Sequence, residues 1–166
     1  MTGFERLAAT AVAFLAFGPS LLVSTAAAAD LQITGPEGRA RTVTEAELKA
    51  MPHETAVLDD HGERRAYQGV SLSALTALIG TPRGEAVSGR AMNLLAVVTA
   101  SDGYRVTFAL PEIDPSFTDR KVILADAKAG QPLDAREGPF RLVVEGDRRP
   151  ARAARNVVGI EVRRVE

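Results

Sequence analysis

The strongest constraint on the fold is a tight turn between two apolar runs in the middle of the chain. Residues 101–104 read Ser-Asp-Gly-Tyr, with an apolar run ahead of them from Val97 and an alternating run behind them. Asp-Gly in this setting predicts a β-hairpin with a type I′ turn, whose two central residues both take positive φ. The alternation places Val106, Phe108 and Leu110 on one face of the second strand. A hairpin this apolar needs a core partner.

Capping signals predict two short helices ahead of the hairpin. Thr44 and Glu47 have the spacing of a capping box, which opens a helix over residues 44–51. Ser71 is a good N-cap for a second helix, whose apolar residues keep helical spacing as far as Gly80.

Most of the remaining chain reads as short strands. In the last of them, Val158, Ile160 and Val162 are expected to share one face. A turn or a short helical piece is expected at 111–117. Strands and helices do not alternate as regular βαβ units, so the predicted class is α+β, with small mixed sheets and short helices. The predicted strands are 31–34, 55–58, 64–68, 93–99, 122–125, 140–144 and 156–165.

The beginning of the chain has the features of a cleaved secretory signal. Arg6 precedes an apolar run from Leu7 to Val23, and alanines at 26–29 supply an Ala-x-Ala cleavage site. The run is interrupted and short for a membrane span. We therefore expect residues 1–29 to be a signal peptide and residues 30–166 to form one domain. The mature protein is expected in the periplasm or outside the cell, and not to span a membrane.

Composition removes several classes of function. The 166 residues have a net charge of -1, so no general basic field favours nucleic acid. The chain contains no cysteine, which excludes disulfides, thiol nucleophiles and thiolate ligands to a metal. Its two histidines are too few for a multi-histidine metal site. His61 lies beside Asp59 and Asp60, a grouping more typical of a solvated turn than of a metal site.

Several motifs, in a fixed order over residues 55–165, carry a resemblance to a known family. They are Tyr67-Gln68-Gly69-Val70-Ser71-Leu72, the turn at 101–104, Val122-Ile123-Leu124-Ala125, Gly130-Gln131-Pro132-Leu133, the run from Gly138-Pro139 to Val144, and Val158-Gly159-Ile160-Glu161-Val162. In this order they resemble the molybdopterin-binding domain of sulfite-oxidase-like oxidoreductases, and most of all its short secreted single-domain members.

The resemblance implies a fold of small sheets and short helices around a pterin groove. In the enzymes of that family, a cysteine ahead of the Tyr-x-Gly-Val-x-Leu motif binds molybdenum. The matching segment here, residues 55–66, has no cysteine. Asp59 and Asp60 are conceivable substitutes, because carboxylates also bind metals. Without the thiolate, the usual oxo-transfer site cannot form in the family's manner, so we expect no metal site and no bound cofactor.

The resemblance also points to a basic region near the C-terminal end. Arg152 and Arg155 match two lysines that face the pterin in the enzymes, and they share one face if their turn is helical. Guanidinium groups that converge suit a phosphate, sulfate or carboxylate. Tyr104 and Arg141 are weaker candidates for the same site. Alternatively, Arg152 and Arg155, with the nearby Arg148, Arg149 and Arg164, are solvated surface arginines that balance acidic residues: Glu137, Glu145 and Asp147.

Two functions follow as hypotheses. The first is a non-catalytic binding or accessory domain, which recognises a small anionic ligand or a periplasmic partner protein and has no catalytic residues. The alternative is a molybdopterin-dependent oxidoreductase, or a subunit of one, that binds its cofactor without a thiolate. The first predicts a purified protein free of molybdenum and pterin, and the second predicts both in stoichiometric amounts.

Overall fold

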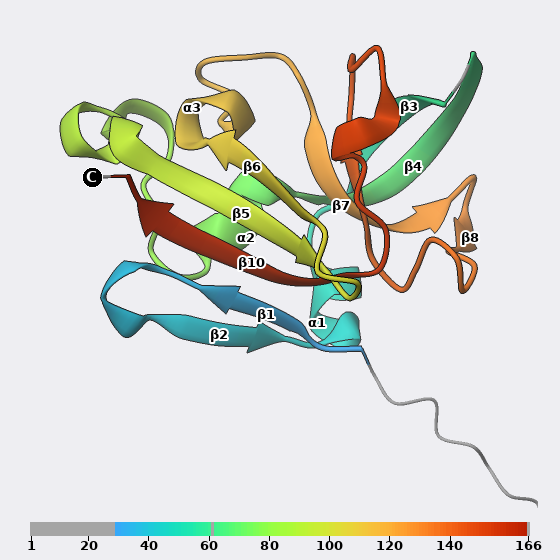
Figure 1. Ribbon diagram of the computed structural model, residues 1–166, viewed down its shortest axis with the longest axis horizontal. Coiled ribbons are helices and arrows are strands. Elements are labelled where there is room, and N and C mark those ends of the chain that lie inside the picture. Colours follow the sequence, from blue (N-terminus) through green and yellow to red (C-terminus); the bar gives the residue numbers. More distant parts are fainter. Residues whose placement is uncertain (1–28, 61, 166) are drawn as a thin grey trace, which may run out of the picture.

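The computed structural model of the protein describes residues 29–60 and 62–165. They form two five-stranded sheets with short helices between them, which confirms the predicted α+β class (Figure 1). The first 28 residues of the predicted signal peptide, and His61, lie outside the described residues. In the part that is described, no helix is long and apolar enough to cross a membrane.

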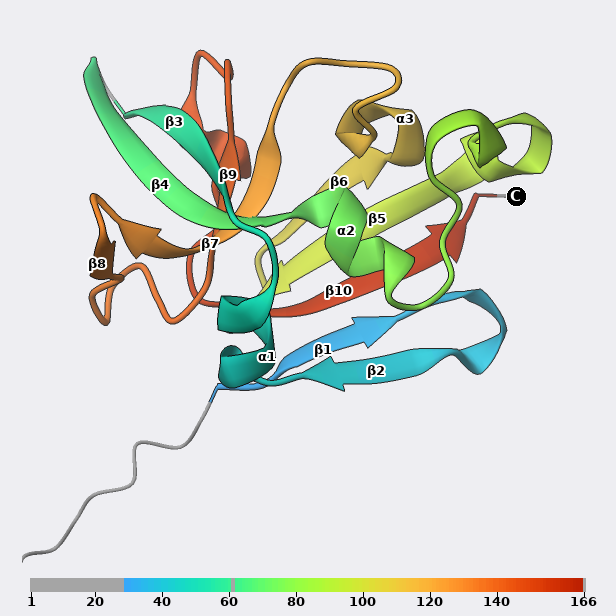
Figure 2. The same ribbon diagram turned by 180° about the vertical axis from the view of Figure 1, so that it is seen from behind.

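The first sheet has the strand order β2-β1-β10-β5-β6. Strand β10 lies at its centre, parallel to β1 on one side and antiparallel to β5 on the other. The first and last strands of the described chain are therefore neighbours (Figures 1 and 2). The strand bounds are β1 Leu31–Thr34, β2 Ala40–Val43, β5 Leu94–Ala100, β6 Arg105–Ala109 and β10 Val157–Arg164.

The second sheet has the order β3-β4-β7-β8, and β9 pairs with β7 as well. All of its ladders are antiparallel. Strand β4, the longest in this sheet, forms a hairpin with β3 that projects beyond the rest of the sheet (Figure 1). The bounds are β3 Glu54–Asp60, β4 Glu63–Ser71, β7 Val122–Lys128, β8 Gln131–Pro132 and β9 Arg141–Val144.

The β5–β6 hairpin forms where the sequence predicts it, but its turn is of another type. The Gly103 amide donates to the carbonyl oxygen of Ala100 at 3.0 Å, and Gly103 has a φ of 85°. Asp102 keeps negative φ, so the type I′ prediction is wrong. The loop has the three-residue form, a tight turn followed by one residue in the left-handed region. The Asp102 carboxylate stabilises it by accepting from the Tyr104 amide at 2.9 Å.

The predicted helix caps are confirmed. Helix α1, Glu45–Ala50, opens with a capping box. The Thr44 hydroxyl accepts from the Glu47 backbone amide, and the Glu47 carboxylate accepts from the Thr44 backbone amide. Helix α2, Leu72–Ala77, opens with the Ser71 hydroxyl accepting from the Ala74 amide at 3.2 Å. The other helices are short: α3 Leu110–Ile113 and the 3-10 helices η1 Pro36–Gly38, η2 Gly84–Ala86, η3 Gly89–Asn93 and η4 Pro150–Arg152.

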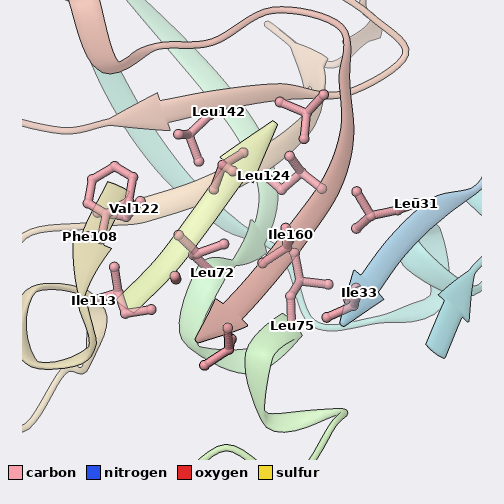
Figure 3. Close-up of a cluster of buried hydrophobic side chains, with 14 of the residues drawn as sticks. Leu31, Ile33, Leu72, Leu75, Phe108, Ile113, Val122, Leu124, Leu142 and Ile160 are labelled. Carbon is pink, nitrogen blue, oxygen red and sulfur yellow. The ribbon is translucent and has the colours of Figure 1, made fainter. Parts of the chain in front are cut away.

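The main core fills the space between the two sheets. In Figure 3, Leu72 and Leu75 of α2 lie among side chains from both sheets, including Ile160 of β10 and Leu124 of β7. The opposite face of the second sheet carries a smaller cluster with Tyr67, Ile123 and Val143. Strand β7 is therefore covered on both faces, which explains why its residues from Val122 to Asp126 are all buried.

One residue of the last strand departs from the predicted pattern. Ile160 and Val162 face the core as expected, whereas Val158 is 43% exposed. The ladder between β10 and β5 has a register shift between Val157 and Gly159. This bulge turns Val157, which is 1% exposed, into the position that alternation predicts for Val158.

A histidine links the segment after α1 to β7. The His53 ring contacts the Met51 carbonyl oxygen at 2.7 Å and the Asp126 carboxylate at 3.1 Å. Burial alone lowers the pKa of His53, but the hydrogen bonds to Met51 and Asp126 and the charge of Asp126 outweigh it and raise the pKa.

We expect this contact to stabilise the protein at acidic pH. Because the folded-state pKa is raised, the stabilisation is fully present below about pH 6.5, the unfolded value, and is lost as pH rises through the folded pKa. Urea unfolding from pH 5.5 to 9 measures it, with His53→Gln as the variant. The wild type is expected to lose about 1 kcal/mol or less relative to His53→Gln as pH rises. Parallel pH profiles would contradict the assignment.

Candidate functional site

The loop between β9 and β10 carries four of the chain's arginines. One of them, Arg152, is held in place by the protein itself. Its guanidinium donates to both carboxylate oxygens of Asp147, at 2.8 and 2.7 Å, and lies 3.4 Å from a carboxylate oxygen of Glu112. It also stacks 5.0 Å from the centroid of the Phe108 ring. The hydrogen bonds to Asp147 raise the pKa of Arg152. The charge of Arg152 is therefore neutralised by Asp147 of the same loop, and the ion pair holds the loop in place.

The other arginines of the loop extend into solvent. Arg148, Arg149 and Arg155 are exposed, and in the described part of the chain none has a hydrogen bond or ion pair. The turn is helical only as far as Arg152, because η4 ends there and Ala153 leaves helical geometry. Arg152 and Arg155 therefore do not share a helical face, as the spacing would have allowed.

Tyr104 supports the loop from the β5–β6 hairpin. Its hydroxyl donates to the Ala151 carbonyl oxygen at 2.8 Å. The residue is still 48% exposed, so it borders the basic surface and also holds the loop backbone.

Arg141 lies elsewhere, in the interior behind the second sheet. It is 1% exposed, its Nη1 contacts the Glu137 carboxylate, and the same nitrogen donates to the Tyr67 hydroxyl at 2.9 Å. Lys128 donates to the other oxygen of Glu137 at 2.6 Å. Burial alone raises the pKa of Glu137, but hydrogen bonds from Lys128 and Tyr67 and the charge of Arg141 lower it overall. Arg141 thus serves the interior and is not on the surface that carries the other candidates.

The exposed part of the arginine loop faces the β3–β4 hairpin across an open groove. In Figures 1 and 2 the loop lies beside β3, on the side of the molecule away from β1 and β2. Two adjoining hollows make up this groove, and both contain Asp59 and Arg148. We call it the arginine groove, and its lining residues are Val57, Asp59, Gly62, Arg64, Glu145, Gly146, Asp147, Arg148, Arg149, Pro150 and Ala151.

Internal contacts occupy much of the acidic lining of the arginine groove. Asp147 binds Arg152, and Arg120 lies 3.7 Å from the same carboxylate. Glu145 accepts from the Val57 amide at 3.1 Å. Asp59 accepts from the Gly62 amide at 2.9 Å and so closes the hairpin turn. Asp59 and Glu145 keep their negative charge, but with Asp147 paired to Arg152 the three arginines Arg64, Arg148 and Arg149 outnumber them in the lining.

The groove does not fit molybdenum in the manner of the family's enzymes. The chain has no thiolate to offer. Among the residues described, no three histidine, cysteine or carboxylate side chains gather where they could hold a metal ion. Asp59, one conceivable substitute, already caps the turn of its own hairpin. No reaction step through a molybdenum centre follows from these residues.

The architecture itself has a counterpart among solved structures. The chain superposes on the crystal structure of the sulfane dehydrogenase SoxCD from Paracoccus pantotrophus with a TM-score of 0.59 and 21% sequence identity. The match covers 80% of this chain and 37% of that chain. The fold is sulfite-oxidase-like. No family profile matches the sequence, and no curated protein matches it.

The comparison confirms the sulfite-oxidase-like fold that the motifs implied, and at this identity it shows the fold alone. This chain spans little more than a third of the sulfane dehydrogenase chain. The predicted ligand residues stay predictions. The structure places Tyr104 and Arg152 in contact with the loop that borders the groove, whereas Arg155 is exposed and does not line the groove, and Arg141 lies apart in the interior. Arg64, from the facing hairpin, had no signal in the sequence because its approach depends on how the second sheet folds.

Proposed function

We propose that this sulfite-oxidase-like domain is a non-catalytic binding domain that recognises a small multivalent oxyanion in the arginine groove. One observation carries the proposal: Arg148 and Arg149 are adjacent, exposed and without an acidic partner among the described residues, on a loop that other contacts fix. Solvated arginines on a surface are usual, but two arginines on a loop whose backbone is fixed, facing a third arginine across the groove, are suited to binding.

The geometry favours a ligand with more than one charged group. Arg148 and Arg149 approach from the loop, and Arg64 approaches from β4 on the other wall. Each guanidinium can bind an oxyanion through two parallel hydrogen bonds. A ligand such as pyrophosphate could engage both walls at once, whereas a monovalent anion could engage only one.

The fixed loop reduces the entropy that binding has to overcome. Arg152, bound to Asp147, and Tyr104, bound to Ala151, anchor the backbone on either side of Pro150. Preorganisation of this kind raises affinity because fewer groups become ordered on binding. Arg152 is accordingly a positioning residue, and Arg152→Ala is a poor probe of direct binding because it also frees Asp147 and Glu112.

We expect Arg148→Ala/Arg149→Ala to weaken pyrophosphate binding at least tenfold, since charge-assisted hydrogen bonds contribute about 1.5–3 kcal/mol each. Titration calorimetry at low salt measures the Kd, and added salt should weaken it. The matched control is Arg90→Ala/Arg163→Ala, which removes the same charge from exposed positions outside the groove. Equal losses in both variants would leave only general electrostatics and overturn the site.

The non-catalytic part of the proposal has a separate test. Protein produced in a molybdate-replete host is examined for molybdenum and for pterin fluorescence. Stoichiometric molybdenum with pterin would overturn the proposal in favour of an oxidoreductase without a thiolate ligand. Folded protein free of both, which binds pyrophosphate, is the expected result. If a partner protein displaces pyrophosphate, the group that the groove recognises is an acidic side chain of that partner and not a free anion.

A further inference from the structure

A second pocket lies at the opposite end of the molecule from the arginine groove, independent of the proposed function. It has a volume of about 240 Å³ and is formed where the turn after β1 meets the end of α2, the start of β5 and the end of β10. Figures 1 and 2 show these segments together at the end away from the β3–β4 hairpin. We propose that this pocket binds a small carboxylate with an apolar tail.

The inner wall of the pocket is apolar. Ile79 and Leu94 are 6% and 5% exposed and belong to the main core. Pro36, Pro82 and Ala91 continue the apolar lining toward the mouth. A wall of this kind favours an aliphatic group, because transfer of each methylene from water to an apolar wall is favourable and affinity rises with every methylene added. The volume is below the usual range for drug-sized ligands, so the pocket favours a small ligand over a nucleotide.

The mouth of the pocket carries two guanidinium groups. Arg39 is fixed there, since its Nη1 donates to the Ile79 carbonyl oxygen at 3.3 Å and its Nη2 lies 3.4 Å from a Glu37 carboxylate oxygen. Arg164 is exposed, and no partner for it exists among the described residues. Arg39 already has an acidic partner, so Arg164 is the group left to bind an anion.

The backbone beneath Arg39 has a glycine, Gly80, at the point of closest approach. Gly80 has a φ of +78°, and a Cβ there would stand 2.6 Å from Nη1 of Arg39. Glycine therefore lets the guanidinium lie close against the end of α2. A side chain at this position would push Arg39 off the pocket mouth.

A buried hydroxyl in the wall adds a second, independent observation. Thr81 lines the pocket and is 8% exposed, and its Oγ1 is buried with no hydrogen-bond partner among the described residues. Buried polar groups in native proteins are almost always paired. In the proposed complex the Thr81 side chain rotates so that its hydroxyl, now shielded from the pocket, donates to a carboxylate oxygen, while Arg164 neutralises the charge.

The test uses octanoate as the probe and two-dimensional amide NMR as the readout. We expect saturable shifts at the Gly80 and Thr81 amides and none at Arg148 or Arg149. 1-Octanol, which has the same tail and no charge, is expected to bind at least tenfold more weakly, as is butyrate, which has the charge and a short tail. Shifts at the arginine groove instead would assign octanoate to the oxyanion site and overturn this proposal.

Variants separate the pocket from general charge effects. Arg164→Ala is expected to weaken octanoate binding about tenfold, from the loss of a charge-assisted hydrogen bond. The matched control is Arg163→Ala, the exposed neighbour that does not line the pocket. Ala91→Phe, which fills the pocket from its rim, should abolish binding in a folded protein. Equal binding by all three variants, or no saturation in the wild type, would overturn the proposal, whatever pyrophosphate does at the arginine groove.

Discussion

Replacement of Gly69 by alanine is expected to destabilise the protein more than any other single methyl addition. Gly69 lies on β4 at a register shift against β7, where the two backbones come unusually close. A Cβ there would stand 2.1 Å from the Leu124 carbonyl oxygen and 2.4 Å from Cα of Ala125. These are backbone atoms of a strand covered on both faces, so neither can move aside.

The expected loss for Gly69→Ala is about 3 kcal/mol or more, beyond the usual cost of an added methylene in a core. That is a large part of the 5–15 kcal/mol that stabilises a typical domain. Urea unfolding followed by circular dichroism measures it. Gly159→Ala is the control, because its Cβ would meet only the Gln32 carbonyl oxygen at 3.5 Å, with φ in the ordinary range. Similar losses in both variants would show that β4 and β7 can separate locally.

The second large effect is expected from Glu137→Ala. This change leaves Arg141, 1% exposed, as a buried cation without its carboxylate partner. Removing one member of a buried ion pair costs about 3–5 kcal/mol, mainly because the remaining charge stays desolvated. The free energy of unfolding from denaturant titration measures the loss. Lys128→Ala, whose side chain is 29% exposed, should lose far less.

A double variant tests the cause of that loss. Glu137→Leu/Arg141→Met removes both charges and keeps apolar volume, so it should recover most of the stability. No recovery would mean that the geometry of the pair, with its bond to Tyr67, matters more than the desolvated charge. Low pH gives an independent view. Because the pKa of Glu137 is lowered on folding, the stabilisation is present above about pH 4.3 and is lost as pH falls through the folded value.

The parts of the fold that depend on neighbouring residues could be predicted from the sequence. Thr44 and Ser71 cap their helices through residues three positions away, and the β5–β6 hairpin joins strands that adjoin in the chain. The type of its turn could not be predicted, because Asp102 tolerates either sign of φ. The hydrogen bonds between Ala100 and residues 103 and 104 determine the turn type. Val158 was misplaced for a similar reason, because the bulge arises from pairing with a strand some sixty residues earlier.

The candidate site shows the same division. The sequence identified the basic region, and it offered both a ligand-binding role for Arg152 and the alternative that the arginines balance acidic residues. The structure pairs Arg152 with Asp147, buries Arg141 against Glu137 where neither interpretation placed it, and leaves Arg148 and Arg149 without such partners in the described chain. The spacing of the arginines in the sequence could not separate the paired from the unpaired ones, because it does not show which side chains the loop directs toward the protein.

The position of β10 sets the order in which this domain can be completed. The two hairpins of the first sheet, β1–β2 and β5–β6, do not pair with each other and meet only through β10. A ribosome makes the central strand last, so a chain still being synthesised can hold both hairpins and yet lack the sheet. The main core closes only when residues 157–164 arrive. Until β10 pairs with β1 and β5, the chain has not reached its native state.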